Sequence, residues 1–589
     1  MNIQEMDIMK SLAQKTYISQ RDLSNSTGYS LGMINQSLKS LELNNLIDSN
    51  NQLTSKGKNT LKQSSPERAI ILAAGFGMRM VPINLETPKA LIEIKGEALI
   101  DRLIKQLHEV GIKEIYVIVG FMKEQLEYLI DDFNVSLIVN PYYSSTNNLH
   151  SLNLANDKIS NTYIIPCDLW CEKNPFNKTE LYSWYMVKSS QNIKSEVRVN
   201  RKKELVLTKN DESGNPMVGI SYISKFDAPV LKENLSSMNQ DPQYNQSFWE
   251  DALFGKSKIT TYAKIVSDED VIEINSYEQL RELDSNSNQL KSKAIDTICR
   301  VLNTTSNNIH DIKVLKKGMT NRSFLFKCYN EKYIMRIPGE GTDKLINRKE
   351  EAEVYAIIKG RNICDDVVYI NPENGYKITK YITASRVCDP YCKTDLQKCM
   401  KVLKDFHTLK LHANHEFNIW DKINFYESLW DNQPSVYRDY KNTKENVFSL
   451  RGYIEKHIEE KVLTHIDAVP DNFLFYFDNQ GKEHIRLIDW EYAGLQDPHV
   501  DIAMFCIYAM YDKSHVDQLI DIYFENKCTN ENRAKIYCYI ASCGLLWSNW
   551  CEYKRNLGVE FGEYSLYQYR YAKDFYKFAR EKIKECEEC

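Results

Sequence analysis

Two aspartates and an asparagine at a fixed spacing place the strongest constraint on what the second half of this 589-residue chain folds into. Asp467 and Asn472 follow His465 in the pattern H-x-D-x-x-x-x-N, and Asp489 follows a hydrophobic run that is typical of a strand. Phosphoryl transfer from ATP needs a carboxylate that accepts the proton of the substrate hydroxyl, and oxygen ligands that hold Mg²⁺ on the phosphates. We therefore predict Asp467 as the catalytic base, and Asn472 and Asp489 as metal ligands. His465 is predicted to be a structural hydrogen-bonding residue.

The whole pattern resembles the choline kinase and aminoglycoside phosphotransferase families, which have a two-lobed, protein-kinase-like fold. The match begins upstream, at residues 317–324 (KGMTNRSF) and 333–337 (YIMRI), and continues through the Asp-Trp-Glu sequence at 489–491. The resemblance implies a phosphate-covering loop, a strand cation paired with a helix carboxylate, and a hinge whose backbone reads adenine. The nucleotide-binding residues that it implies are Gly318, Asn321, Arg336, Glu351, Thr379 and Tyr381. Asp501 is expected to brace the catalytic loop.

Aromatic residues near the C-terminus bear on the substrate. Trp547 and Trp550 are three residues apart, so they lie on one face of a helix, and Tyr564 ends the sequence EFGEY at 560–564. The permanent positive charge of choline donates no hydrogen bond, and aromatic faces bind such a cation with about 0.5 to 2 kcal/mol for each contact. Both segments resemble the C-terminal part of choline kinases, which implies a substrate site formed by Glu491, Trp547, Trp550 and Tyr564. Two alternatives stay open: aromatic stripes are usually core, and ethanolamine would instead want carboxylates and other acceptors.

A second chemical motif follows an apolar strand that begins at residue 68. The sequence LAAGFGMRM at 72–80 contains two glycines, whose backbone N–H groups can approach phosphate oxygens closely, and TPKAL follows at 87–91. Arg79 and Lys89 add positive charge against a triphosphate, and Lys89 is predicted to take part in catalysis. The predicted nucleotide-binding residues are Leu72, Ala73, Ala74, Gly75, Gly77 and Arg79. The alternative is a dinucleotide-binding turn, but the third glycine of that motif is missing at the required spacing.

This block resembles the sugar-phosphate nucleotidyltransferase superfamily over its whole length, and within it the bacterial CTP:phosphocholine cytidylyltransferases. The matching segments are residues 123–129, residues 140–152 and the strand YIIPCD, which ends at Asp168. The resemblance implies that Asp168 places Mg²⁺ on the α-phosphate of CTP, so that an oxygen of phosphocholine attacks in line. One residue departs from the family pattern. Asn275 stands where a second metal-binding aspartate is expected, and Glu273, on the same predicted strand face, is its proposed replacement.

Trp249 and Glu250 match a family segment that combines an aromatic residue with an acid. The ring of Trp249 would offer its face to a quaternary ammonium, and Glu250 would offer negative charge. A tryptophan that simply packs in the core explains Trp249 equally well, so both interpretations stay open.

The first block, residues 1–65, has apolar residues at helical spacing followed by strand-like pieces at 46–48 and 52–54. This order resembles a winged helix, which is a helix-turn-helix followed by a wing. The expected recognition stretch at 30–44 has Lys39 as its only basic residue, so contacts to phosphates would be weak and sensitive to salt. DNA binding, pairing into a homo-oligomer, and regulation by enzyme-like domains that sense choline metabolites all stay open.

Together these blocks predict a multidomain chain of α/β and α+β class. It has a winged helix at 1–65, a Rossmann-like nucleotidyltransferase sheet at 68–284, a polar linker at 285–292 and a two-lobed protein-kinase-like domain at 293–589. A net charge of −5 gives no chain-wide basic field for nucleic acid. The first residues lack the apolar core of a signal peptide and the 15 cysteines have no framework spacing, so we expect a cytoplasmic protein with no membrane span. The predicted function is a bifunctional transferase that uses ATP, CTP and Mg²⁺ to convert choline to phosphocholine and then to CDP-choline.

Overall fold

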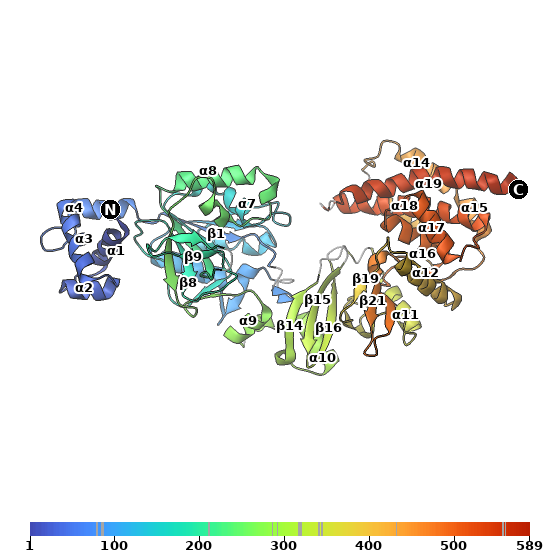
Figure 1. Cartoon of the computed structure of the whole chain (residues 1–589), viewed down its shortest axis with the longest axis horizontal. Helices are drawn as coiled ribbons and strands as arrows, with labels where there is room; N and C mark the ends of the chain where they lie inside the picture. Colours follow the sequence, from blue (N-terminus) through green and yellow to red (C-terminus); the bar gives the residue numbers. More distant parts are fainter. Residues whose placement is uncertain are drawn as a thin grey trace. The chain divides into compact units, whose positions relative to one another are not determined.

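The computed structural model describes the chain apart from residues 78–79, 84–86, 210–211, 286, 291, 316–320, 340–341, 343–344, 432, 557–558, 560 and 589. The chain forms two compact units, each with its own core (Figure 1). The first contains residues 1–296 and 312–314, and the second contains residues 297–311 and 315–589. Each unit is described separately below.

The first unit begins with four helices: α1 (Ile3–Gln14), α2 (Gln20–Thr27), α3 (Leu31–Leu43) and α4 (Ser55–Gln63). Each helix starts at a polar residue whose side chain accepts a hydrogen bond from the backbone N–H three residues further on: Asn2, Ser19, Ser30 and Thr54. Between α3 and α4 an antiparallel bridge joins Ile47 to Leu53, where the sequence predicts two short strands. The predicted helices are therefore present, whereas the assignment to the winged-helix family stays a prediction.

Side chains of α1 attach these helices to the sheet that follows. The carboxylate of Asp7 accepts hydrogen bonds from the hydroxyls of Tyr29 and Tyr182, each at 2.6 Å. Lys10 forms an ion pair with Glu180, whose side chain is fully buried. Breaking a buried ion pair leaves an uncompensated charge, so these contacts hold the helices and the sheet in one unit.

The sheet of the first unit has seven strands in the order β12-β8-β11-β6-β1-β4-β5. In chain order the strands are β1 (Arg68–Ala73), β4 (Glu114–Val119), β5 (Ser136–Val139), β6 (Thr162–Pro166), β8 (Trp184–Lys188), β11 (Met217–Ile223) and β12 (Tyr262–Val266). β1 is parallel to both β4 and β6, whereas β11 runs antiparallel to β6 and β8. The predicted Rossmann-like sheet is confirmed. The loop after β1 lies at the carboxyl edge of the parallel strands, where ligands bind in sheets of this kind.

Helices cover both faces of this sheet. Ile71 of β1 points into one core and Ile70 into the other, because successive strand side chains alternate between the faces. The first core includes residues of α5 (Leu99–Glu109), and the second includes residues of α8 (Ala228–Asn239). Burial on both faces explains why β1 reads as a continuous apolar run.

The second unit begins with an antiparallel sheet that carries part of the kinase motif. Its strands β15 (Asn321–Cys328), β16 (Glu331–Pro338), β18 (Lys377–Lys380) and β17 (Val367–Ile370) lie side by side in that order. On β16, Arg336 pairs with Ser323 of β15 and with Lys377 of β18, so it occupies the middle of the sheet. The helix α11 (Arg348–Ile358) comes after β16 in the chain.

Short strand pairs in the second unit frame the catalytic sequence. β20 (Val462–Thr464) pairs with β23 (Gly494–Gln496), and β21 (Phe473–Phe477) pairs with β22 (Glu483–Leu487), both antiparallel. Eight helices complete this part: α12 (Lys393–Thr408), α13 (Ile419–Ser428), α14 (Tyr440–Phe448), α15 (Arg451–His457), α16 (His499–Tyr508), α17 (Lys513–Tyr523), α18 (Asn530–Asn556) and α19 (Glu563–Glu588). The sequence at 465–472 therefore joins β20 to β21, and Asp489 comes just after β22.

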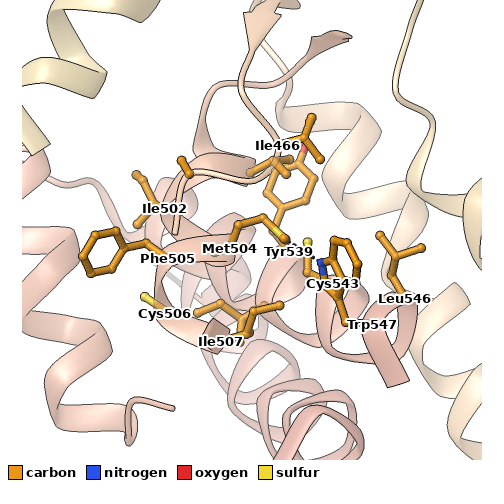
Figure 2. Packing of buried hydrophobic residues seen from close by; sticks show 14 of the residues in the cluster. Ile466, Ile502, Met504, Phe505, Cys506, Ile507, Tyr539, Cys543, Leu546 and Trp547 are labelled. Carbon is orange, nitrogen blue, oxygen red and sulfur yellow. Dashed lines mark hydrogen bonds between the residues drawn. The ribbon is translucent and has the colours of Figure 1, made fainter. Parts of the chain in front are cut away.

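The helix α18 is the centre of this lobe, because every residue from 534 to 554 is buried. Figure 2 shows part of this core, in which Met504 of α16 lies next to Cys543 and Trp547 of α18. The indole Nε1 of Trp547 donates to the sulfur of Met504 at 3.1 Å. Two aromatic residues predicted to bind substrate, Trp547 and Trp550, thus lie on a helix that is buried over most of its length.

No helix among the described residues combines the length and the apolar character that crossing a lipid bilayer requires.

Gly544→Ala is expected to destabilise the second unit by about 1 to 3 kcal/mol. A Cβ at Gly544 would lie 2.7 Å from Cβ of Tyr571 and 2.8 Å from the carbonyl oxygen of Gln568, both on α19. Urea unfolding followed by circular dichroism measures the change. Gly452→Ala on α15 is the matched control, since its Cβ meets nothing within 4 Å. Equal unfolding midpoints for the two variants would show that α18 and α19 do not pack this closely.

Candidate active sites

A buried carboxylate holds the catalytic loop of the second unit. Asp501 on α16 accepts hydrogen bonds from the backbone N–H of His465 at 3.1 Å and of Ile466 at 2.7 Å. Ile466 has a φ of 70°, which a β-branched residue rarely adopts, so the backbone is strained at this point. Asp501 is fixed in turn by His407, whose Nε2 lies 2.8 Å from its carboxylate. The expectation that Asp501 braces this loop is confirmed.

Asp467 and Asn472 lie together in the loop. The Nδ2 of Asn472 donates to the carbonyl oxygen of Asp467 at 2.8 Å and to its Oδ2 at 3.2 Å. His465 is fully buried, and its Nε2 donates to the carbonyl of Ile488 at 3.0 Å. Burial lowers the pKa of His465 to about 4, so the ring is neutral at physiological pH. This geometry agrees with a structural His465 and leaves Asp467 as the basic group of the loop.

Negative charge is concentrated beside this loop. Burial, together with the charges of Asp489 and Glu491, raises the pKa of Asp467 to about 8. Burial also raises the pKa of Asp489, although the charges of Lys377 and Arg336 oppose that shift. A divalent cation would relieve the repulsion between these carboxylates.

The donor set in the loop fits Mg²⁺. The side chains of Asn472 and Asp489 supply oxygen donors, which Mg²⁺ prefers, and a protein commonly holds this ion through one or two carboxylates together with substrate phosphates. In the part of the chain that the structure describes, no cluster of three or more His, Cys, Asp or Glu side chains is arranged to hold a metal. A site completed by nucleotide phosphates is consistent with that finding.

The ion pair expected between Arg336 and Glu351 is present and bidentate. Both terminal nitrogens of Arg336 contact the carboxylate of Glu351, one of them at 2.8 Å, and Arg336 also donates to the carbonyl of Gly375 at 3.0 Å. Burial alone would raise the pKa of Glu351, but the charges of Arg336 and Lys377 outweigh it and lower the pKa to about 2. Arg336 is therefore held by a fully ionised partner in the middle of the sheet.

Arg348 extends this network toward the catalytic loop. It donates to Glu351 at 3.0 Å, to Glu491 at 3.2 Å and to the amide oxygen of Asn321 at 3.1 Å. The amide nitrogen of Asn321 donates to the same oxygen of Glu491 at 2.8 Å. Glu491, predicted to bind the substrate, thus contacts Asn321, a predicted phosphate-loop residue. Its role in substrate binding stays a prediction.

The role of the hinge residues Thr379 and Tyr381 in binding adenine also stays a prediction, and the geometry limits which of their backbone groups can take part. Thr379 is buried on β18 and pairs with Ile334 of β16. The backbone N–H of Tyr381 donates to the carbonyl of Lys332 at 2.9 Å. Because that N–H is already used within the sheet, adenine would have to be read by other backbone groups of this segment.

Five aromatic rings form a continuous cluster next to the catalytic loop. Neighbouring ring centroids are 5.6 Å apart for Tyr492 and Trp547, 5.5 Å for Trp547 and Trp550, 5.2 Å for Trp550 and Phe561, and 6.5 Å for Phe561 and Tyr564. The predicted residues Trp547, Trp550 and Tyr564 are therefore brought together. We call these five residues the aromatic cluster.

The charge of Asp467 acts on residues of the aromatic cluster. Burial raises the pKa of the hydroxyls of Tyr492 and Tyr564, and the charge of Asp467 adds to the shift in both. The same holds for Tyr508, whose ring centroid is 6.2 Å from that of Tyr564. Three tyrosines from separate segments thus lie within the electrostatic reach of Asp467.

Sequence reasoning missed Arg348, Tyr492, Tyr508 and Phe561. Tyr492 directly follows the Asp-Trp-Glu sequence, and Phe561 lies in the EFGEY segment, so their positions were a usable signal. Arg348 lies three residues before Glu351, a spacing that pairs opposite charges on a helix. Tyr508 had no comparable signal, because a tyrosine at the end of an apolar helix usually packs in a core.

In the first unit, the described residues of the loop after β1 pack against neighbouring segments. Leu72 and Ala73 end β1, and the carbonyl of Ala74 accepts a hydrogen bond from the N–H of Phe121 at 3.1 Å. Gly77 has a φ of 67°, and a Cβ there would lie 3.3 Å from the side chain of Lys89. Among the described residues, a Cβ at Gly75 would meet nothing within 4 Å. Nucleotide binding by this loop stays a prediction.

Lys89 joins the two predicted metal-binding positions. Its ammonium forms an ion pair with Asp168 and donates to Oδ1 of Asn275 at 2.9 Å. The N–H of Ile274 donates to the carbonyl of Asp168 at 2.9 Å, which holds the two segments together. The oxygens of Asp168 and Asn275 therefore converge on one cation, and oxygen donors of this kind also suit Mg²⁺.

The prediction that Glu273 and Asn275 lie on the same strand face is wrong. β13 (Val271–Glu273) ends at Glu273, so Asn275 is not on the same strand face. Glu273 pairs instead with Leu169 of β7 (Leu169–Cys171), and its charge acts on the hydroxyl of Tyr185. Asn275, rather than Glu273, is the residue that shares Lys89 with Asp168.

Trp249 and Glu250 lie in a short 3-10 helix (Trp249–Phe254) with different surroundings. Trp249 is 1 % exposed and packs in the core, with its ring centroid 6.0 Å from that of Tyr185. The Oε1 of Glu250 accepts a hydrogen bond from the hydroxyl of Tyr185 at 2.8 Å, whereas Oε2 is buried and has no hydrogen-bond partner in the described part of the chain. Burial raises the pKa of Glu250 to about 7. The geometry favours the core interpretation for Trp249 and leaves Glu250 as a buried acceptor.

Two predicted phosphate contacts, Arg79 and Gly318, lie outside the described residues.

Comparison with known proteins agrees with both sites. A model of the choline/ethanolamine kinase family matches residues 312–542, and a model of the MobA-like NTP transferase domain matches residues 69–177. The choline-phosphate cytidylyltransferase of Streptococcus pneumoniae is 30 % identical over 224 residues, which are 37 % of this chain and 96 % of that protein. Protein LicA of Haemophilus influenzae is 27 % identical over 268 residues, which are 42 % of this chain and 95 % of LicA. The 2-aminoethylphosphonate cytidylyltransferase of Lancefieldella rimae is 31 % identical over 205 residues, which are 34 % of this chain and 82 % of that enzyme.

The sheet with Lys89 and Asp168, and the loop with Asp467, define a transferase that combines a nucleotidyltransferase with a kinase. Through its first unit, the chain belongs to the choline-phosphate cytidylyltransferase family. Its second unit matches the choline/ethanolamine kinases. Both predicted enzyme classes are thereby confirmed.

Glu250→Gln is expected to stabilise the first unit at high pH. The folded-state pKa of Glu250, about 7, lies above its ordinary value of 4.5, so folding favours the protonated form. The stability due to that form is complete below the ordinary value and is lost as the pH rises through the folded-state pKa. At pH 8.5 we expect the melting temperature to rise by roughly 2 to 6 °C, and at pH 4.5 we expect little change. Differential scanning calorimetry at the two pH values measures this effect.

Asp251→Asn is the control for that comparison, because Asp251 is the exposed neighbour of Glu250. A stabilisation by Glu250→Gln that is equal at both pH values would contradict a raised pKa for Glu250.

Proposed function

We propose that the chain phosphorylates choline with ATP and then transfers CMP from CTP to the phosphocholine, which gives CDP-choline and pyrophosphate. The observation that carries the proposal is the aromatic cluster beside Asp467. Aromatic faces bind a quaternary ammonium without needing hydrogen bonds from it. A choline molecule held there by its ammonium would present its hydroxyl to the Asp467 carboxylate.

The kinase step follows from the residues of the catalytic loop. Asp467 accepts the hydroxyl proton as the choline oxygen bonds to the γ-phosphorus of ATP, and the bond from that phosphorus to the β,γ-bridging oxygen breaks to release ADP. Asn472, through its hydrogen bonds, holds Asp467 in place. Arg336, fixed by Glu351, supplies positive charge to the phosphates. Mg²⁺, when bound by Asn472 and Asp489, would neutralise charge on the phosphates.

The transferase step uses Lys89 and Asp168. An oxygen of the phosphocholine phosphate attacks the α-phosphorus of CTP, the bond to the β-phosphate breaks and pyrophosphate leaves. Lys89 is close enough to Asp168 to neutralise it, and a triphosphate would offer the same ammonium a stronger partner. Asp168 and Asn275 are the residues that would hold Mg²⁺ on the α-phosphate. The first reaction makes the substrate of the second.

Two substitutions are expected to separate the activities. With choline, ATP, CTP and Mg²⁺, Asp168→Asn should stop CDP-choline formation while phosphocholine accumulates, because only the transferase loses its metal-binding carboxylate. Asp467→Asn should slow phosphocholine formation by about 100-fold or more, since it removes the general base. Mass spectrometry of both products measures the two rates.

Asp467→Asn supplied with phosphocholine should still make CDP-choline, which controls for folding. Asp478→Asn, in an exposed turn of the same unit, should leave both rates unchanged. The proposal fails if the wild-type chain forms neither product, and its transferase part fails if phosphocholine alone accumulates.

A primary ammonium substrate is the second candidate. The buried Oε2 of Glu250 lacks a partner, and a primary ammonium, unlike choline, would donate a hydrogen bond to it. The relative from Lancefieldella rimae is named for a substrate with a primary amine. This candidate concerns the transferase half, since the cluster in the kinase half consists of aromatic faces.

Competition between choline and ethanolamine is expected to favour choline. The kcat/KM for choline should exceed that for ethanolamine by about tenfold or more, because ethanolamine loses the contacts of the methyl groups with the rings. Tyr564→Leu should reduce this preference, whereas Tyr567→Leu, 44 % exposed on α19, should not. A coupled assay for ADP gives the constants. Equal or better use of ethanolamine would refute the aromatic cluster as a choline site.

The N-terminal helices enter the proposal as a winged helix with an assembly or regulatory role. The bridge between Ile47 and Leu53 has the antiparallel form that a short wing requires, which supports that class. The contacts of Asp7 and Lys10 with the sheet would transmit a change in these helices to the transferase unit. DNA binding and homo-oligomerisation stay alternatives for the same helices.

A further inference from the structure

One buried lysine next to the aromatic cluster has an unusual partner. Lys554 lies near the end of α18 and is 7 % exposed. Its ammonium nitrogen is 5.7 Å from the ring centroid of Trp550, which is within the range of a cation–π contact. Among the described residues, no carboxylate or other acceptor lies within ion-pair or hydrogen-bond distance of this ammonium.

The other buried lysines of this unit are paired. Lys535, also on α18, lies 2.7 Å from a carboxylate oxygen of Asp497 and donates to the carbonyl of His457 at 2.8 Å. Lys377 donates to the hydroxyl of Tyr355 at 2.6 Å. A buried ammonium is costly unless it is paired, and an aromatic ring replaces an acid only in part. Lys554 is therefore held less firmly than either of these lysines.

The ring that Lys554 contacts is closed to solvent. Trp550 is 2 % exposed, and Trp547 and Phe561 pack against it on their own sides. A substrate cation reaches this ring only if a neighbour moves. Among these neighbours, Lys554 is the one with a flexible side chain and a charge that repels the substrate.

Lys554 also lies toward the catalytic residues. The charge of Glu491 acts on its ammonium, although burial outweighs that effect and lowers the pKa of Lys554. Glu491 contacts Asn321 and Arg348 in the network described above. The carboxylate of Glu491 is therefore near enough to act on this ammonium, which lies beside the ring of Trp550 in the aromatic cluster.

We propose that Lys554 is a placeholder cation. Its ammonium occupies the face of Trp550 and leaves when the ammonium of the substrate binds. This inference rests on the proposed function of the second unit as an amino-alcohol kinase. Displacing Lys554 is part of every binding event, so the residue sets the substrate affinity without taking part in phosphoryl transfer.

The test removes the positive charge of Lys554 and keeps an unbranched side chain at that position. Lys554→Met should lower the KM for choline by about three- to tenfold, with kcat and the KM for ATP unchanged, because the competing cation–π contact is removed. Lys554→Arg keeps a cation over the ring and should have a KM close to that of the wild type. Lys513→Met is the matched control, since the ammonium of Lys513 lies 5.3 Å from the ring of Tyr537 but pairs with Asp517.

A binding measurement separates this inference from the proposed reaction. Isothermal titration of the full chain with tetramethylammonium should give a dissociation constant about three- to tenfold lower for Lys554→Met than for the wild type, whether or not either protein phosphorylates choline. Equal constants, a higher constant for the variant, or no binding to either protein would overturn the inference. A raised KM for ATP would also overturn it, because Lys554 would then serve the nucleotide. Lys554→Gln provides the same comparison if the methionine variant does not fold.

Discussion

Crowded negative charge in a buried site is the constraint on which the second unit depends. Burial and the charges of Asp489 and Glu491 raise the pKa of Asp467, and burial and the charge of Asp489 raise the pKa of Glu491. The bidentate pair of Arg336 and Glu351 and the bridging contacts of Arg348 bring positive charge to the same place. This concentration of negative charge explains why Arg336 and Arg348 are buried, although burying apolar side chains would cost less free energy.

In the first unit, a single lysine balances the negative charge of the predicted site. Lys89 neutralises Asp168 and also donates to Asn275, so its ammonium holds these two oxygen donors close to each other. A neutral Asn275 is compatible with this arrangement, because one ammonium balances one carboxylate. In the proposed reaction, the same two oxygens would become available to a metal if a triphosphate drew the ammonium of Lys89 away.

Most of the kinase site was predictable because its parts are local in sequence. Asp467 and Asn472 share one loop, and the pair of Arg336 and Glu351 follows from a strand and the helix after it. The convergence of Asn275 on Lys89 could not be predicted, since it depends on where β13 ends rather than on the motif. Tyr508 and Lys554 were missed for the same kind of reason. A residue at the end of an apolar helix looks like core until the fold shows which neighbours it meets.

The fold of the first unit was predicted from its alternating apolar runs, and the antiparallel β11 was not. A short apolar run has the same appearance in either direction, so its orientation depends on the connections around it. The contact of the N-terminal helices with the sheet was also invisible in sequence. It depends on Asp7, Lys10 and Glu180, which are ordinary charged residues until burial pairs them.

The position of Trp547 and Trp550 on α18 has a consequence for how such an enzyme could change its substrate. From residue 534 to residue 554 this helix is enclosed on all sides, so a new side chain at Trp547 would disturb the core as well as the ligand. Substitutions would disturb the core less where α18 ends, near Lys554, and in the segment of Phe561 and Tyr564 that follows. Substrate selectivity would therefore evolve through Lys554, Phe561 and Tyr564. Trp547, in contrast, would be retained because the core of the unit depends on it.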